Sequence, residues 1–246
     1  MPKTAAILFT LSLFSLSFAF NFQISAQVKS NASATGEVAK DKDKKKDNVT
    51  PETKIDKPLS QSLNDEILKE INLFRANPKS YAAYLTDRKS LYNENILTLE
   101  NGQKIVTFEG IAAVDDAIKE ISISNSLKPF ILSAELSKAA KDHLADMSKN
   151  SFFSHKGSDG NMPDFRIRRY LNISQSEIRE NLALDRKNAR EIVLGWLIDD
   201  GSAKRGNRKS LLSPTLNFIG IATGKTKDEK DLAVATFSSN NLKSAN

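Results

Sequence analysis

The sequence predicts an α+β domain in which helices pack on an antiparallel sheet. Over the first two thirds of the chain, several segments carry apolar residues at steps of three and four, the spacing of amphipathic helices. Two runs near the end, 217–223 and 232–237, alternate instead, and a polar turn with Gly224 and Asp228 joins them, as in a β-hairpin. The clearest strands follow the helices, so the chain lacks the strand–helix alternation of a parallel α/β sheet.

The first helix is predicted to begin after Ser62, with Asp65 at the capping-box position. Its apolar residues recur at steps of four, four and three: Leu63, Ile67, Ile71 and Phe74. Asn77-Pro78 ends this helix and opens a short second one, because proline is favoured at the first helical position. The apolar side of that second helix consists of Tyr81, Tyr84 and Leu85.

The pattern weakens between residues 87 and 110, where only 104–108 indicates a short extended piece. Beyond Gly110 the helical spacing returns, at Ile111, Val114, Ile118 and Ile121. Ser133 is then expected to cap the longest helix of the chain. The inner face of that helix is predicted to hold Leu136, Ala140, His143, Leu144 and Met147.

The second half begins with a short helix after Pro163, with Phe165, Ile167 and Tyr170 as its apolar side. Residues 178–184 alternate enough to predict a strand. Asn188 is expected to cap a helix that ends at Asp199-Asp200-Gly201 and buries Ile192, Val193, Trp196 and Leu197. A basic loop over 204–209 leads to the final hairpin.

The N-terminus is predicted to direct export. A lone Lys3 precedes an apolar run from residue 5 to residue 20, which is typical of a secretory signal peptide, cleaved after Ala19 or, by preference, after Ala26. The run is short for a bilayer span of about 20 residues, so we expect no transmembrane span in the mature chain. Residues 27–60, with the charge run 41–47, are predicted to form a disordered charged tether, leaving one domain over 61–246.

Composition limits the functional class. The chain carries a formal net charge of +6, but residues 61–246 hold 27 basic and 24 acidic side chains, so nothing in the domain demands nucleic acid. An exported chain without cysteine must be held together by packing alone, which favours a bacterial protein that is secreted or resides in the cell envelope.

Two residues are the main candidates for a site. His155 follows two phenylalanines and precedes a glycine-punctuated turn, which suggests a cleft lined by an apolar wall and a titratable group. Glu180 lies in the middle of the apolar predicted strand, where a carboxylate is costly to bury unless it is paired. We expect His155 or Arg179 to be its partner. His143, on an apolar helix face, is interpreted as a core histidine with satisfied hydrogen bonds rather than a metal ligand.

Two further charged groups have simple structural interpretations. The Asp199-Asp200 pair is expected to terminate a helix; binding of a divalent cation by the pair is the alternative. The basic loop, with Lys204, Arg205, Arg208 and Lys209, is interpreted as a solvated surface.

Taken in order, several motifs resemble those of one family. Ala-Ala-Lys-Asp-His leads into Phe-Phe-Ser-His155, followed by Arg-Glu180-Asn-Leu-Ala, Trp196-Leu-Ile-Asp-Asp-Gly, Arg-Gly-Asn207-Arg-Lys-Ser-Leu-Leu and Phe-Ile-Gly-Ile-Ala. Together they resemble the CAP superfamily of cysteine-rich secretory, antigen 5 and pathogenesis-related proteins, in its cysteine-free bacterial branch, also called SCP-domain proteins. The resemblance runs from about residue 63 to residue 237.

This resemblance implies a three-layer α-β-α sandwich with a cleft over a central antiparallel sheet. In the family, two histidines and two glutamates often meet in that cleft, sometimes around a divalent metal. His155 and Glu180 match one of each. Asn207 stands at the place of the second histidine, and the second glutamate falls near Leu194 and is missing. The cleft is then expected to be lined by His155, Glu180, Asn207 and Trp196, with Zn²⁺ binding absent or weak because asparagine is a poor zinc ligand.

Three functions stay open. The first is a secreted, non-catalytic binding module with no cofactor, whose cleft holds an envelope component, a lipid or a protein. The second is a peptidase-like hydrolase in which His155 acts as base and Glu180 orients it. The third is a structural surface protein that neither binds nor turns over a small molecule.

Overall fold

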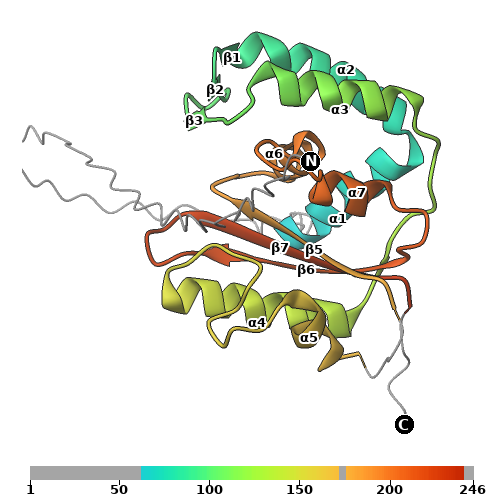
Figure 1. Ribbon diagram of the computed structural model, residues 1–246, viewed down its shortest axis with the longest axis vertical. Coiled ribbons are helices and arrows are strands. Elements are labelled where there is room, and N and C mark those ends of the chain that lie inside the picture. Colours follow the sequence, from blue (N-terminus) through green and yellow to red (C-terminus); the bar gives the residue numbers. More distant parts are fainter. Residues whose placement is uncertain (1–61, 172–175, 241–246) are drawn as a thin grey trace, which may run out of the picture. The chain divides into compact units, whose positions relative to one another are not determined.

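The computed structural model describes residues 62–171 and 176–240, and within these ranges it confirms the predicted α+β class (Figure 1). The predicted signal peptide and tether lie outside the described residues. The helices of the described region are α1 (Leu63–Ala76), α2 (Pro78–Arg88), the 3₁₀ turn η1 (Lys89–Leu91), α3 (Ile111–Ile123), α4 (Ala134–Asn150), α5 (Pro163–Arg168), α6 (Ala189–Ile198) and α7 (Gly206–Leu212). The strands are β1 (Tyr92–Asn93), β2 (Ile96–Thr98), β3 (Lys104–Val106), β4 (Ile131–Leu132), β5 (Ile178–Leu184), β6 (Phe218–Lys225) and β7 (Asp231–Ser238).

The larger sheet has the strand order β4-β6-β7-β5. Strands β5, β6 and β7 form antiparallel pairs, as the sequence predicts, and place Glu180 and Gly220 on either side of Thr236. The sheet is not purely antiparallel, because β4 pairs with β6 in parallel. This two-residue strand forms where the chain crosses from α3 to α4, and Ser133 ends it by donating its backbone N–H to Ile219 O at 2.8 Å.

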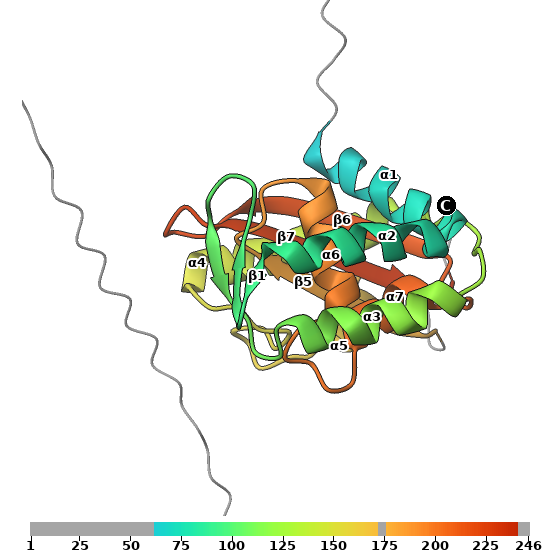
Figure 2. The same cartoon turned by 90° about the horizontal axis from the view of Figure 1, so that it is seen from above.

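Helices lie on both faces of this sheet (Figure 1). Helices α4 and α5 cover one face, and α1, α6 and α7 lie on the other. Helices α2 and α3 run side by side beyond that second group (Figure 2). One apolar cluster fills the space between α1, α2, α3, α6 and the sheet, and smaller clusters lie beneath α4. The small β1-β2-β3 sheet joins α2 to α3.

The predicted helix starts are confirmed. Ser62 Oγ and Ser133 Oγ each accept a hydrogen bond at 3.3 Å from the backbone N–H three residues on, and Asn188 Oδ1 accepts one at 2.9 Å from Glu191 N. These side chains satisfy backbone donors that have no partner within the helix. No helix in the described part of the chain is long and apolar enough to cross a membrane.

Two expectations about side-chain direction are wrong. On α5, Ile167 is buried as predicted, but Phe165 is 56% exposed and Arg166 is buried in its place. The basic segment 204–209 is not a solvated loop, because most of it belongs to α7 and Arg208 is fully buried. Arg208 Nε lies 3.0 Å from Glu120 Oε2, and its Nη2 also pairs with Asp116.

Candidate functional site

Glu180 is a buried carboxylate on β5, an edge strand of the larger sheet. It lies on β5 opposite Thr236 of β7, and its side chain is only 1% exposed. A carboxylate in this position requires charged or hydrogen-bonding partners. The next residue back, Arg179, points to the opposite side of the pleated strand and pairs with Glu177 instead.

The partners of Glu180 are His155 and Arg166. His155 Nδ1 donates to Glu180 Oε1 at 2.9 Å, and Arg166 Nη2 donates to Glu180 Oε2 at 2.7 Å. The structure therefore brings together the two main candidates, although the expected alternative partner, Arg179, is replaced by Arg166 of α5. Both oxygens of the carboxylate are engaged, and the His155 side chain remains 46% exposed at the surface.

His143 lies behind this pair on α4 and is fully buried. Its Nε2 donates to Ser154 O at 2.8 Å and lies 3.7 Å from Glu180 Oε1, beyond hydrogen-bond distance. Burial lowers the pKa of His143, an effect that the nearby Glu180 charge partly opposes, so the ring is neutral at physiological pH. A neutral ring that donates through Nε2 leaves Nδ1 as an acceptor. In the described region this buried Nδ1 has no partner.

Asn207 is held by Asp199. Asp199 Oδ1 accepts from Asn207 Nδ2 at 2.7 Å, and Asp199 Oδ2 accepts from Asn207 N at 2.8 Å. Asp199 is buried, and that burial raises its pKa, although these hydrogen bonds act in the opposite direction. Asp200 instead accepts from the backbone N–H groups of Phe108 and Glu109. The two aspartates therefore secure separate chain segments.

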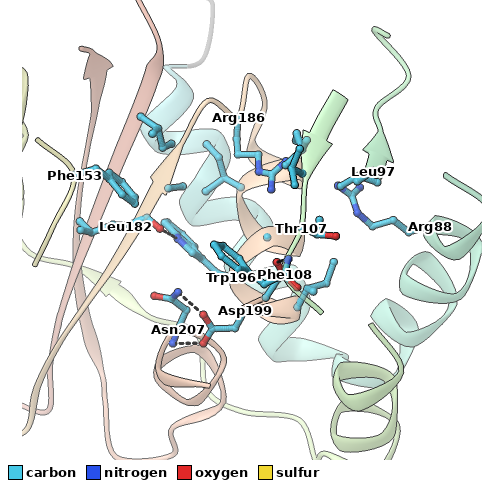
Figure 3. Close-up of a pocket in the computed structure, with 18 of the residues that line it drawn as sticks. Arg88, Leu97, Thr107, Phe108, Phe153, Leu182, Arg186, Trp196, Asp199 and Asn207 are labelled. Carbon is cyan, nitrogen blue, oxygen red and sulfur yellow. Dashed lines mark hydrogen bonds between the residues drawn. The ribbon is translucent and has the colours of Figure 1, made fainter. Parts of the chain in front are cut away.

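Two hollows flank Asn207. The first, here called the His155 hollow, has a volume of about 360 Å³ and is lined by His155, Glu180 and Asn207 together with residues from α5, β5 and α7. The second, about 430 Å³, is called the Arg186 pocket, and its walls include Trp196 and Asn207 (Figure 3). Trp196 is buried and donates Nε1–H to Leu182 O at 2.8 Å. The expected cleft is thus divided: Trp196 lines the second hollow and not the first.

The side chains around Glu180 do not fit a divalent metal. No group of three or more His, Cys, Asp or Glu side chains within residues 62–171 and 176–240 is placed to hold one. Arg166 occupies Oε2 of Glu180, so a metal bound to this carboxylate would lie beside a fixed positive charge. The side chain of Asn207 is held toward Asp199, because its Nδ2 donates a hydrogen bond to Asp199 Oδ1.

Arg166 is the site residue that sequence reasoning missed. A buried carboxylate predicts a cationic partner, but the sequence offered Arg179 on the same strand and concealed Arg166 in a short amphipathic segment. The sequence signal for Arg166 was its position beside Ile167, which was predicted to lie on the inner side of this helix and is fully buried.

Comparison with known proteins gives one family. A model of the cysteine-rich secretory protein family, CAP, matches residues 68–238. The uncharacterized protein YkwD of Bacillus subtilis (strain 168) is 30% identical over 95 residues, which make up 39% of this chain and 35% of that protein. The matched stretch thus spans about a third of the length of that relative.

Three solved structures of bacterial proteins each match about half of this chain. An outer surface protein from Borrelia burgdorferi is 24% identical with a TM-score of 0.39, covering 54% of this chain and 91% of that one. An extracellular protein with an SCP domain from Bacillus anthracis str. Ames is 20% identical with a TM-score of 0.37, covering 52% and 37%. A cysteine-rich secretory protein from Staphylococcus aureus subsp. aureus Mu50 is 14% identical with a TM-score of 0.34, covering 53% and 38%.

Proposed function

The chain belongs to the cysteine-rich secretory protein (CAP) family, and from this premise we propose that it is a non-catalytic binding module, secreted or held in the cell envelope. In this proposal residues 1–26 are a signal peptide, 27–60 a charged tether and 61–246 the binding domain. The domain uses its three-layer α-β-α scaffold to present a cleft to an envelope component, a lipid or a protein.

The ion pair between Arg166 and Glu180 carries this proposal. A histidine that acts as general base becomes positively charged, and a neighbouring carboxylate stabilises that charge. Here the negative charge of Glu180 is already neutralised by a guanidinium at 2.7 Å. The arrangement supports His155 as a positioned hydrogen-bonding group at the edge of a hollow, rather than as a strong base.

A peptidase-like hydrolase is the second candidate, and one observation favours it. His155 Nδ1 donates to Glu180, so the ring is oriented with Nε2 directed away from the carboxylate, as in a histidine–carboxylate dyad. A nucleophile is the missing part. Within the described ranges no serine or threonine hydroxyl is hydrogen-bonded to His155, and Ser154 Oγ instead accepts from Lys156 N at 3.0 Å.

Turnover assays separate the two candidates. The purified full chain is incubated with peptides, esters and peptidoglycan fragments, in parallel with His155→Gln and with a control, Lys156→Gln, that alters an exposed neighbouring side chain. A binding module gives no turnover with any of the three proteins. Turnover that is lost in His155→Gln and kept in Lys156→Gln would establish the hydrolase and overturn the proposal.

The bound molecule itself is sought by recovering the native protein and identifying by mass spectrometry whatever co-purifies with it. A binding module is expected to retain a molecule that is present at a constant ratio to the protein. Material that co-purifies equally with a Glu180→Ala variant would not belong to the His155 hollow.

A further inference from the structure

The Arg186 pocket has the size and the walls of a small-molecule site. It lies between the β1-β2-β3 sheet, the end of β5 and helix α6, and its volume of about 430 Å³ falls within the range of ligand pockets, about 300–1,000 Å³. Its apolar wall includes Leu97, Ile105, Leu182, Ile192 and Trp196 (Figure 3). Val106 and Phe108, also among the lining residues, are 77% and 82% exposed, so apolar side chains continue to the surface.

One cationic side chain of this pocket, Arg186, forms no ion pair within the described region. Arg186 follows β5, and its stem runs over α6, where a Cβ at Gly195 would lie 3.6 Å from Arg186 Nε. Its Nη1 is buried and has no hydrogen-bond partner. The Arg186 guanidinium makes no hydrogen bond or ion pair with any residue in the described part of the chain.

The nearby acidic groups are already engaged. Glu191 forms a two-point ion pair with Arg88, with distances of 2.7 and 2.6 Å, and Asp185 accepts from Gln103 Nε2 at 2.8 Å. Glu191 is thus taken by Arg88, and in the described region neither Glu191 nor Asp185 forms an ion pair with Arg186. Burial, followed by the charge of Arg88, lowers the pKa of Arg186, and the charges of Glu191 and Asp185 oppose this effect only in part.

Other buried arginines show how this fold normally satisfies such a group. Arg75 donates to three backbone carbonyls at 2.7, 2.8 and 3.0 Å and stacks over the Phe130 ring at 3.8 Å. Arg166 and Arg208 pair with carboxylates, although each keeps buried nitrogens without a hydrogen bond, so what distinguishes Arg186 is that it has no ion pair in the described region. A guanidinium that is partly buried without such partners destabilises the folded state, so its place in the pocket wall indicates that an anion completes it.

We propose that the Arg186 pocket binds a small organic monocarboxylate with an apolar body. The carboxylate pairs with the Arg186 guanidinium, whose planar fork suits two parallel hydrogen bonds to carboxylate oxygens. The apolar body packs against Trp196 and the aliphatic wall. This inference rests on the proposed binding function and names the class of ligand.

The opposite end of the pocket excludes a second negative charge. Asp199 lines that end and lies away from Arg186 (Figure 3). A dicarboxylate that reached from Arg186 across the pocket would meet this acidic side chain, so a single carboxylate is favoured.

Three probes test the ligand class: octanoate, its neutral analogue octanamide, and acetate, which has the charge without the body. Each is titrated into the full chain by calorimetry near neutral pH, with the fluorescence of Trp196, the only tryptophan in the sequence, as an optical readout in the pocket. We expect octanoate to bind about tenfold or more tightly than octanamide or acetate, because only octanoate supplies both interactions.

The variant Arg186→Met keeps the apolar stem and removes the charge. It is expected to bind octanoate no better than octanamide, whereas Lys187→Met, which removes an exposed charge from the same loop, retains the wild-type preference. Without ligand, Arg186→Met is expected to unfold at the same or a higher temperature than the wild type. Arg75→Met, which leaves three carbonyls without a donor, is expected to unfold at a lower temperature.

Equal affinity for octanoate and octanamide, or an octanoate preference that survives in Arg186→Met, would overturn the inference. A loss of folding in Arg186→Met would overturn it as well, because the guanidinium would then be a structural group. These outcomes would not contradict the proposed binding function, because that proposal is tested separately, by assays for turnover that depends on His155. Conversely, His155-dependent turnover would remove the proposed function without changing the affinities at Arg186.

Discussion

Arg166 and Glu180 form an almost completely buried ion pair, with Nη2 2.7 Å from Oε2 and side chains 5% and 1% exposed. The pair connects α5 to the middle of β5. Arg166 Nη2 also lies 3.4 Å from His155 O, so the loop that carries His155 is attached to the same guanidinium. The position of His155 therefore depends on both charges of this pair.

Removing the carboxylate from this pair is expected to destabilise the protein strongly. Glu180→Ala leaves the buried Arg166 guanidinium unpaired and takes away the acceptor of His155 Nδ1. Breaking a buried pair in this way typically lowers the free energy of unfolding by about 3–5 kcal/mol. Chemical denaturation measures the change. Glu177→Ala, which removes the carboxylate that pairs with Arg179 near the surface, is expected to stay within about 0.5 kcal/mol of the wild type. Equal effects of the two substitutions would place Glu180 in solvent.

Zinc binding is expected to remain weak even when the missing histidine is restored. Asn207→His supplies an imidazole at the position where the family motif has one, but Arg166 still occupies Glu180 Oε2 and repels a cation. Calorimetric titration with Zn²⁺ is expected to show no sub-micromolar site in the wild type or in this variant. A sub-micromolar constant in the wild type that His155→Ala abolishes would contradict both the prediction and the structural reason for it.

Acid is expected to destabilise the protein in part through His143. Because burial lowers the pKa of His143 in the folded state, the unfolded chain takes up this proton at higher pH than the native protein does. The contribution of the neutral ring is therefore complete above the unfolded value of about 6.5 and is lost as the pH falls below it toward the folded pKa.

The variant His143→Gln isolates this contribution, since the amide can still donate to Ser154 O while no longer titrating. Unfolding midpoints of both proteins are compared from neutral to mildly acidic pH. The gap between them is expected to change as the pH falls, with the wild type losing stability more steeply. Parallel curves would show that His143 does not titrate differently in the two states.

Most helix faces and caps could be predicted from local sequence, whereas the partners of buried charges could be predicted only in part: His155 was expected beside Glu180, and Arg166 was not. Ser62, Ser133 and Asn188 act over three residues, so their roles follow from the neighbouring sequence. The cationic partner of Glu180, Arg166, is 14 positions away on another element, whereas the arginine expected from the sequence was the adjacent Arg179. Which cation pairs with a buried carboxylate depends on which element packs over its strand, and here that element is α5.

The site was predictable in part for the same reason. His155 and Glu180 each stand out locally, one after two phenylalanines and before a glycine-punctuated turn and the other inside an apolar strand, and the order of the motifs supports placing them in one cleft. Arg186 had no such motif. It follows a strand in a polar loop, and only the three-dimensional structure shows that Glu191 is taken by Arg88.

The basic segment before β6 combines the buried Arg208 with exposed lysines. Arg208 is fully buried beside Glu120 and Asp116, whereas Lys204 and Lys209 are exposed. Arg208→Ala is expected to lower the free energy of unfolding by about 3 kcal/mol or more, because it takes the cation from Glu120, removes one of the two cationic partners of Asp116 and opens a cavity. Lys204→Ala and Lys209→Ala are expected to change it by less than about 0.5 kcal/mol. Similar small effects at all three positions would restore the interpretation of this segment as a solvated surface.

The close packing of α4 on the sheet requires glycine at position 220. A Cβ on Gly220 would lie 2.0 Å from the carbonyl carbon of Leu136 and 2.1 Å from Ser137 N, both of them backbone atoms. Thr236, which is opposite Gly220 in the sheet, donates to Leu136 O at 2.9 Å across the same contact. Gly220→Ala therefore has to push α4 outward, and α4 also carries His143 about two turns further along.

We expect this single methyl group to lower the free energy of unfolding by at least about 1–3 kcal/mol, as overpacking in a tight interior does. Gly206→Ala is the matched control, because a Cβ there meets no atom within 4 Å and its backbone is helical. That substitution is expected to be neutral or to stabilise the protein by up to about 1 kcal/mol. Chemical denaturation compares the two variants. If Gly220→Ala were as stable as Gly206→Ala, α4 would not pack on β6 as closely as described, and the place of His143 behind Glu180 would lose its support.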